Sequence, residues 1–278
     1  MTEEPTVTYT SASGESFTFD EKHSLLVSDD ERAWEYGTDG GAPVLEPRTL
    51  DARLVYTGEG MRGECERLLG LAYADLDSQT PGTYTVGEWS LRCYLLKGAA
   101  YSSMPSWAGW KVSLYAPDPV WRRETCHEFL PGSTSSTDVG GFDYETDYPH
   151  DLGAAAKSSE LAVAAVAPCD FRLTVYGYAA KPSVYIAGNR YGVDVTVPSG
   201  GLLVIDSTKK ASMQGDSVVL RDKYGNAQDV FPKRVKGAEG SGSYIFERIP
   251  GGTHSVTWDQ GWGFSLDLIE RRAALPWT

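Results

Sequence analysis

The chain has 278 residues, of which 41% are hydrophobic and 23% are charged, so its composition suits one large or two medium-sized soluble domains. Its formal net charge of −13 argues against general binding to nucleic acid or to a membrane surface, because both need a positive field. No apolar run is long enough to cross a bilayer, and the acidic residues 1–5 are not typical of a signal peptide. We therefore predict neither a nucleic-acid partner nor membrane insertion.

The first half of the chain is expected to consist of strands around one helix. Residues 62–76 are the best helical segment, because their apolar residues recur at the spacing of one helix face. These residues are Cys65, Leu68, Leu69, Ala72 and Leu76. Alternating apolar and polar residues predict short strands at 17–19, 24–28, 50–57, 89–95 and 110–115. Residues 37–47 are a possible arm, meaning an extended segment that could pair with a neighbouring subunit.

The middle of the chain carries an unusual joint. Pro117 and Pro119 stop the last of these strands, because proline has no backbone donor for the ladder and restricts the residue before it. Residues 132–137 have the composition of a flexible linker. Residues 142–152 are acidic and aromatic, too apolar for a free linker, and are expected to lie against a domain face or another subunit. We predict an N-terminal domain at 1–121, a linker at 122–147 and a C-terminal domain at 148–278.

The second half is predicted to be almost entirely strands. Apolar and polar residues alternate in short segments that are separated by the turn residues Gly, Asn and Pro. This pattern places the strands at 171–176, 184–186, 193–197, 201–205, 217–221, 244–247, 255–258 and 264–269. Many short strands at this spacing are typical of a β-sandwich or jelly roll. The predicted fold class is therefore mainly β, with two β-sandwich domains and a single helix packed on the first.

Two local patterns resemble ligand-binding motifs. Residues 58–63 read G-x-G-x-x-G before a helix, but the preceding segment is too polar for a strand buried on both faces, and no further βα unit follows. We interpret these glycines as a turn.

Asp143, Glu145 and Asp147 alternate like the start of a calcium loop, yet Tyr148 and Ala154 stand where an EF-hand needs Gly and Glu. We predict no metal site and no cofactor.

No catalytic group can be picked out from the sequence. His23, His127, His150 and His254 are far apart in the sequence, and no G-x-S-x-G elbow supports a catalytic triad. No pair of carboxylates suggests glycoside cleavage. The four cysteines lack zinc spacing and are predicted to be reduced thiols of a protein that folds in cytoplasm; they are Cys65, Cys93, Cys126 and Cys169. We predict no catalytic residue and no enzyme activity.

Aromatic residues raise the question of sugar binding. Trp258, Trp262 and Tyr191 are candidates to stack on sugar rings. The alternative is structural, with Trp258 in a core strand and Trp262 packed in the turn at 261–263. Both interpretations stay open at the level of the sequence.

One set of segments is informative because of its order along the chain. The first half carries Arg48 and Arg53 in a strand, then the helix at 62–76, Pro81-Gly82, and a β segment that ends in Ala-Pro-Asp-Pro-Val-Trp at 116–121. The joint contains Asp-Tyr-Pro-His-Asp at 147–151. The second half closes with Phe-Glu-Arg-Ile-Pro-Gly-Gly at 246–252, His-Ser-Val-Thr-Trp at 254–258 and the segment 264–272. This ordered set resembles the distal tail (Dit) proteins of long-tailed siphophages and prophages.

This resemblance implies an N-terminal β-sandwich that forms a ring, usually of six subunits, and a galectin-like C-terminal β-sandwich. It implies a non-enzymatic hub at the virion tail tip, made and assembled in the cytoplasm of the host bacterium. Its expected partners are the tail tube, the tape-measure protein, tail-tip or tail-lysin proteins and receptor-binding proteins. A carbohydrate-binding adhesin that uses the second sandwich is the alternative, and a glycan-active enzyme ranks last.

Overall fold

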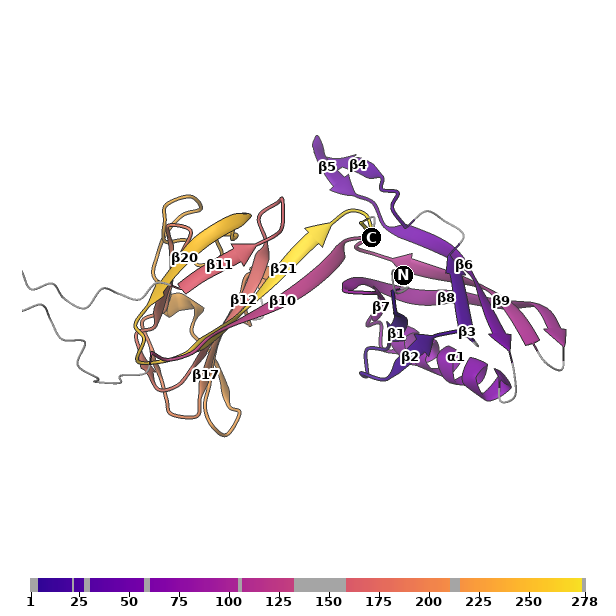
Figure 1. Cartoon of the computed structure of the whole chain (residues 1–278), viewed down its shortest axis with the longest axis horizontal. Coiled ribbons are helices and arrows are strands. Elements are labelled where there is room, and N and C mark those ends of the chain that lie inside the picture. Colours follow the sequence, from indigo (N-terminus) through magenta and orange to yellow (C-terminus); the bar gives the residue numbers. More distant parts are fainter. Residues whose placement is uncertain are drawn as a thin grey trace, which may run out of the picture. The chain divides into compact units, whose positions relative to one another are not determined.

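A computed structural model describes residues 5–21, 23–27, 31–57, 61–104, 107–132, 159–210 and 216–276. The chain divides into two compact units (Figure 1). Unit 1 comprises Met1–Arg123 and Arg271–Thr278, and unit 2 comprises Glu124–Glu270. The chain passes from unit 1 to unit 2 within β10 (Trp121–Phe129) and returns within β21 (Phe264–Arg272). Strands dominate both units, and α1 (Met61–Asp77) is the one α-helix in the described ranges, which confirms the predicted fold class.

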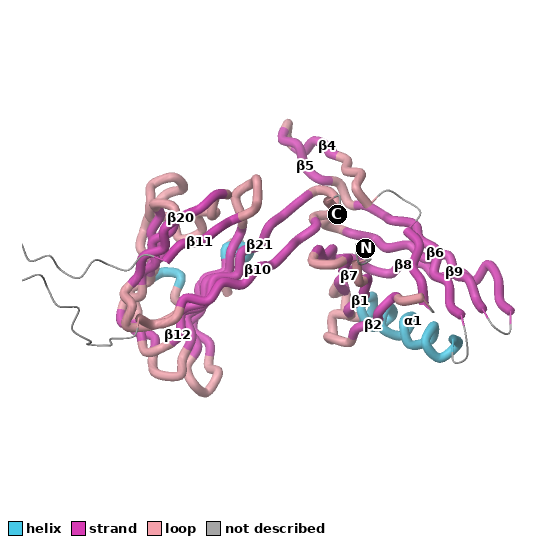
Figure 2. The backbone as a smooth tube through the Cα atoms, viewed as in Figure 1, coloured by secondary structure: helices cyan, strands magenta, loops and turns pink. Residues whose placement is uncertain are grey.

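Unit 1 is built from two antiparallel sheets that share one long strand (Figure 2). The order is β2-β1-β7-β8 in one sheet and β3-β6-β9-β8 in the other. The first part of β8, from Trp89 to Cys93, pairs with β7, and the part from Tyr94 onward pairs with β9. A β-bulge at Leu96 lies beside this change of partner, and bulges bend the strand that carries them. The strands are β1 (Val7–Thr10), β2 (Ser16–Phe19), β3 (His23–Val27), β6 (Arg48–Thr57), β7 (Gly82–Val86), β8 (Trp89–Met104) and β9 (Trp107–Ala116).

The helix packs its apolar face on the core of unit 1, as the sequence predicted. Cys65, Leu68 and Ala72 are buried against residues of both sheets. The buried stripe continues through Leu71 rather than Leu76, which is 38% exposed. At the end of the helix the inward position is taken by a carboxylate.

That carboxylate, Asp75, ties the helix to the first sheet. It is 1% exposed, and it accepts a hydrogen bond of 2.7 Å from the Tyr9 hydroxyl and one of 2.8 Å from the Ala12 amide. A buried carboxylate needs such donors, because the loss of water is otherwise uncompensated. Gly82 passes directly over the pair, where a Cβ would lie 2.6 Å from both Asp75 Oδ2 and the Tyr9 oxygen.

We predict that Gly82→Ala lowers the free energy of unfolding of unit 1 by about 1–3 kcal/mol, because the added methyl group overpacks the Asp75–Tyr9 contact. Gly70→Ala is the matched control: it lies in α1, and apart from the helix's own backbone and its chain neighbours nothing lies within 4 Å of the added Cβ. It should stabilise the protein by about 0.5–1 kcal/mol, since alanine is the better helix former. Urea unfolding followed by circular dichroism measures both, and equal effects of the two substitutions would contradict the prediction.

Unit 2 is a sandwich of two antiparallel sheets. The larger has the order β19-β18-β17-β12-β21-β10, and the smaller has the order β11-β20-β14-β15. A short pair, β13–β16, completes the unit. The strands are β11 (Ser159–Val163), β12 (Asp170–Tyr176), β13 (Ala179–Ala180), β14 (Ser183–Ile186), β15 (Asn189–Gly192), β16 (Thr196–Val197), β17 (Leu202–Asp206), β18 (Val218–Arg221), β19 (Ala227–Asp229) and β20 (Gly252–Trp258). Two 3₁₀ turns lie at Ser207–Lys209 and Phe231–Lys233.

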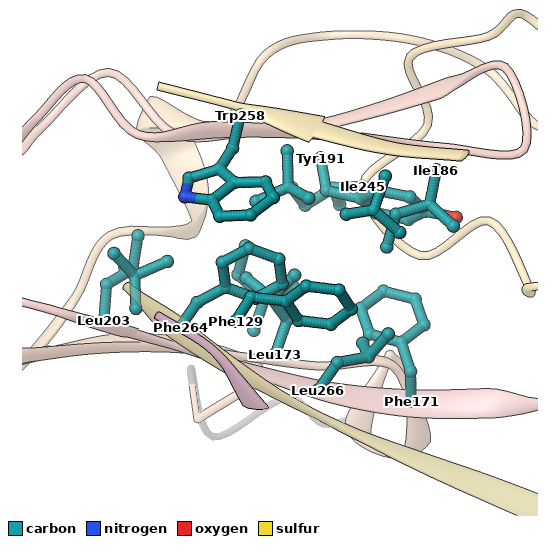
Figure 3. Packing of buried hydrophobic residues seen from close by; sticks show 14 of the residues in the cluster. Phe129, Phe171, Leu173, Ile186, Tyr191, Leu203, Ile245, Trp258, Phe264 and Leu266 are labelled. Carbon is teal, nitrogen blue, oxygen red and sulfur yellow. The ribbon is translucent and has the colours of Figure 1, made fainter. Parts of the chain in front are cut away.

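The inner faces of the two sheets enclose an aromatic core (Figure 3). Phe129 stacks on Phe264 with ring centroids 4.6 Å apart, and Trp258 meets Phe264 edge-on at 5.3 Å. Phe171 from the larger sheet meets Tyr191 from the smaller at 4.9 Å. Such pairs add about 0.5–1.5 kcal/mol each beyond the burial of their surface.

Three sequence predictions are wrong in detail. Residues 122–129, assigned to the linker, form most of β10, because the buried side chains of Trp121 and Phe129 anchor both ends of this strand. Residues 193–197 are not one strand, since the Val195 amide bonds to the Val193 carbonyl and turns the chain before β16. Residues 244–247 also turn, through a bond from the Glu247 amide to the Tyr244 carbonyl.

The C-terminal residues lie in a different unit from the one that the sequence assigned them. Residues 271–276 group with unit 1, where Leu275 is buried in the core and its amide donates to the Glu31 carbonyl at 3.1 Å. Residues 133–147 of the predicted linker lie outside the described residues, as does the acidic and aromatic joint at 142–152.

Candidate assembly surfaces

The residues singled out for chemistry do not assemble into a site in the described part of the chain. Residues 58–60 of the glycine motif, the carboxylates at 143–147 and His150 lie outside it. His127 lies in β10, and the His254 ring contacts the Pro250 carbonyl at 2.8 Å. Within the described ranges, no cluster of three or more His, Cys, Asp or Glu side chains could hold a metal ion, and α1 is too short and polar to span a membrane.

The three aromatic residues considered as candidates for sugar stacking are core residues. Trp258, Trp262 and Tyr191 are 8%, 4% and 2% exposed. Trp258 donates its Nε1 hydrogen to the Trp262 carbonyl at 2.9 Å, and the Tyr191 hydroxyl donates to the Glu247 carbonyl at 2.8 Å. Of the two interpretations left open by the sequence, the structural one therefore fits these residues, because a stacking face must be open to the ligand.

We predict that Trp258→Ala lowers the free energy of unfolding by about 3–5 kcal/mol, as expected for a large side chain removed from a packed core. Tyr224→Ala is the control in the same unit: Tyr224 is 78% exposed, so its loss should change stability by less than about 0.5 kcal/mol. Thermal and urea unfolding give the comparison. If the Trp258→Ala variant were folded and as stable as the parent protein, the burial of Trp258 in the core would be contradicted.

The described thiols are poorly suited to nucleophilic chemistry. None of the four cysteines forms a disulfide, and Cys126 is exposed whereas the other three are buried. Burial raises the pKa of Cys93 to about 12 and also raises that of Cys65. A hydrogen bond to the Asp267 carboxylate, helped by partial desolvation, raises the pKa of Cys126 to about 11. These thiols stay protonated at neutral pH, and the thiolate is the reactive form.

The Asp267 contact has a testable consequence. Asp267→Asn removes the negative charge beside Cys126, so the pKa of the thiol should fall and its thiolate fraction at pH 8 should rise. Alkylation by iodoacetamide should accelerate about threefold for each unit of pKa lost, because a less basic thiolate is also a weaker nucleophile. Glu160→Gln, an exposed carboxylate on β11, is the control. Equal alkylation rates in the two variants would contradict the assignment.

A hairpin extends from the two sheets of unit 1 (Figure 1). It consists of β4 (Tyr36–Asp39) and β5 (Ala42–Leu45), joined by Gly40 and Gly41. Both glycines have positive φ, 56° and 88°, as a two-residue type I′ turn requires. This hairpin, at 36–45, overlaps the arm predicted at 37–47.

The hairpin together with the residues at its base, 33–47, is acidic and aromatic. Trp34 and Tyr36 are 62% and 53% exposed. Residues 33–47 contain Glu35, Asp39 and Glu46 and no lysine or arginine. A two-stranded hairpin is marginally stable alone, and exposed aromatic side chains are enriched at interfaces, so this element is a candidate for contact with a partner.

A second surface is a groove beside β3. This strand pairs with β6 and, in the described part of the chain, with no other strand, so it is an edge of its sheet. The groove has a volume of about 950 Å³. Its apolar wall includes Leu25, Leu26, Val27, Val7, Val86 and Leu275, and its charged residues are Glu31, Arg32, Glu88, Arg123 and Arg272.

Two arginines distant in the sequence meet at Trp89 in this groove. The guanidinium carbon of Arg123 lies 5.2 Å from the Trp89 ring centroid, and that of Arg272 lies 5.0 Å away. Arg123 also pairs with Glu88 at 3.4 Å. The sequence analysis missed this site; its one local signal is a pair of Arg-Arg dipeptides, 122–123 and 271–272, in a chain of net charge −13.

Comparison with known proteins gives a fold. No family model matches the chain. No curated protein matches either. Among solved structures, the Dit protein (gp 19.1) of phage SPP1 matches 97% of this chain and 100% of its own, with a TM-score of 0.55 and 12% identity. It is described as a paradigm of the hub adsorption apparatus in phages that infect Gram-positive bacteria.

Chains of the phage P2 baseplate are similar to the same extent. The calcium-bound activated baseplate matches with a TM-score of 0.53 and 12% identity, and the strontium-bound form with 0.54 and 11%. Both matches cover 98% of this chain and 100% of the other. The resemblance to Dit proteins seen in the sequence is thus confirmed at the level of the fold, across both units.

Proposed function

We propose that this chain is a Dit-like hub protein of a phage or prophage tail tip, with a structural and non-enzymatic role. The observation that carries the proposal is the match of both units, over 97% of the chain, to a protein described as the hub of an adsorption apparatus. Fold alone does not imply function, so the surfaces of the chain must supply the rest of the argument.

Those surfaces suit an assembling subunit. Unit 1 has an exposed edge strand, β3, and a projecting aromatic hairpin, β4–β5. Unpaired strand edges and exposed aromatic side chains both recruit neighbouring chains. In the proposed assembly, unit 1 forms a closed homo-oligomeric ring, with six copies expected from the family resemblance, and unit 2 is the galectin-like domain.

The ring joins the tail tube to tail-tip and adsorption proteins in this proposal. Its partners are the tail tube, the tape-measure protein, tail-lysin proteins and receptor-binding proteins. The chain is made in the cytoplasm of the host bacterium and ends at the tail tip of the virion. The adhesin alternative loses its main support, because Trp258, Trp262 and Tyr191 are buried in the core of unit 2.

The experiment is a concentration series of the purified full chain, followed by light scattering and negative-stain electron microscopy. We expect rings with a mass of about six times the 30.3 kDa of the chain. The self-association constant should depend on salt concentration less strongly than it would for a contact held by charges alone, because apolar burial supplies most of the contact energy. A chain that stays monomeric up to the solubility limit and binds saccharides on a glycan array would overturn the proposal.

A further inference from the structure

We propose that the β4–β5 hairpin of one copy docks in the arginine-lined groove beside β3 of the next copy. This inference rests on the proposed ring and names the two surfaces that meet in it. Both surfaces belong to unit 1 and consist of described residues.

Charge complementarity is the first argument. Two copies that each carry a net charge of −13 repel one another, so a stable contact needs a local region of opposite charge. The groove contains three arginines and two glutamates, and one of these glutamates, Glu88, is paired with Arg123. The hairpin segment 33–47 contains three acids and no base. The groove thus has an excess of positive charge, and the hairpin segment carries only negative charge.

Apolar surface on both sides is the second argument. The hairpin and its base expose Trp34, Tyr36 and Val44. The groove exposes Leu26, which is 59% accessible, next to Val27 and Val86. Aromatic side chains inserted among aliphatic ones, with charged groups at the rim, are the usual composition of a protein interface with high affinity.

The free edge of β3 supplies the third argument. Its outward backbone groups can pair with a strand from another chain, and β4 and β5 are already extended and preorganised as a hairpin. Preorganisation lowers the entropy lost on binding. The hairpin does not fill the groove of its own chain, because Trp34 and Tyr36 remain more than half exposed.

The symmetry of such a contact is consistent with a ring. The hairpin and the groove are different patches of unit 1, so a contact between them is head-to-tail. Repeated head-to-tail contacts either close into a ring or continue as a filament. The closed form is the assembly proposed above, and it leaves no hairpin and no groove unoccupied.

The direct test places a photocrosslinking amino acid at Tyr36 of the full chain and maps its products by mass spectrometry. We expect crosslinks between copies at residues 25–27 or 86–89, which line the groove. The same probe at Tyr224 of unit 2 is the control and should not reach these residues. Oligomers that crosslink from position 36 to other surfaces would overturn the docking site and leave the ring intact. The absence of any oligomer up to the solubility limit would overturn the docking site together with the ring on which it rests.

A charge-reversal series tests the same contact by assembly. E35K together with D39K should weaken self-association at least tenfold, because the hairpin then meets arginines with like charge. Adding R123E and R272E to that variant should restore most of the self-association that was lost. E124K with E128K makes the same change in net charge on β10 of unit 2 and should have little effect.

Circular dichroism of each purified variant confirms that it is folded before assembly is measured. A folded hairpin variant that assembles like the parent would contradict the docking proposal. So would a folded four-residue variant that shows no recovery, because restored opposite charges would then give no attraction.

Discussion

The structure of unit 1 depends on one strand that belongs to two sheets. Successive inward residues of β8, Trp89, Leu91, Cys93 and Leu95, are all buried, although the strand changes partners from β7 to β9 between Cys93 and Tyr94. Continuous burial through that change holds the two sheets around one core. The helix α1 packs on the same strand, and Asp75 connects its end to β1.

Both candidate assembly surfaces follow from this arrangement. Trp89, the first residue of β8, is where Arg123 and Arg272 converge, so the groove forms only when the chain has returned from unit 2. Leu275 then joins the core of unit 1. Unit 1 is therefore completed by both ends of the chain, with unit 2 inserted between them. Such non-local contacts slow folding, because a long loop must close before they form.

Three buried polar side chains have clear structural roles. Asp75 receives the Tyr9 hydroxyl and a backbone amide, and Trp258 and Tyr191 each donate to a backbone carbonyl. Raised thiol pKa values keep Cys93 and Cys126 in their unreactive form. An exposed acidic hairpin and an arginine-lined groove remain as the features that a folded monomer does not explain, and both suit contact with a neighbour.

The sequence alone determined the mainly β class, the helix at 62–76 and most strands, because apolar periodicity reports directly which face of an element is buried. It also determined the likeness to Dit proteins, which the fold confirms. Apolar periodicity reports burial but not strand pairing. Ile245 and Phe246 are buried, yet residues 244–247 form a turn rather than the predicted strand. Only the tertiary structure decided that Trp258 and Trp262 face inward, that residues 271–276 complete unit 1, and that Arg123 and Arg272 share one tryptophan. Each of these is a contact between segments far apart in the chain, and no local pattern encodes such contacts.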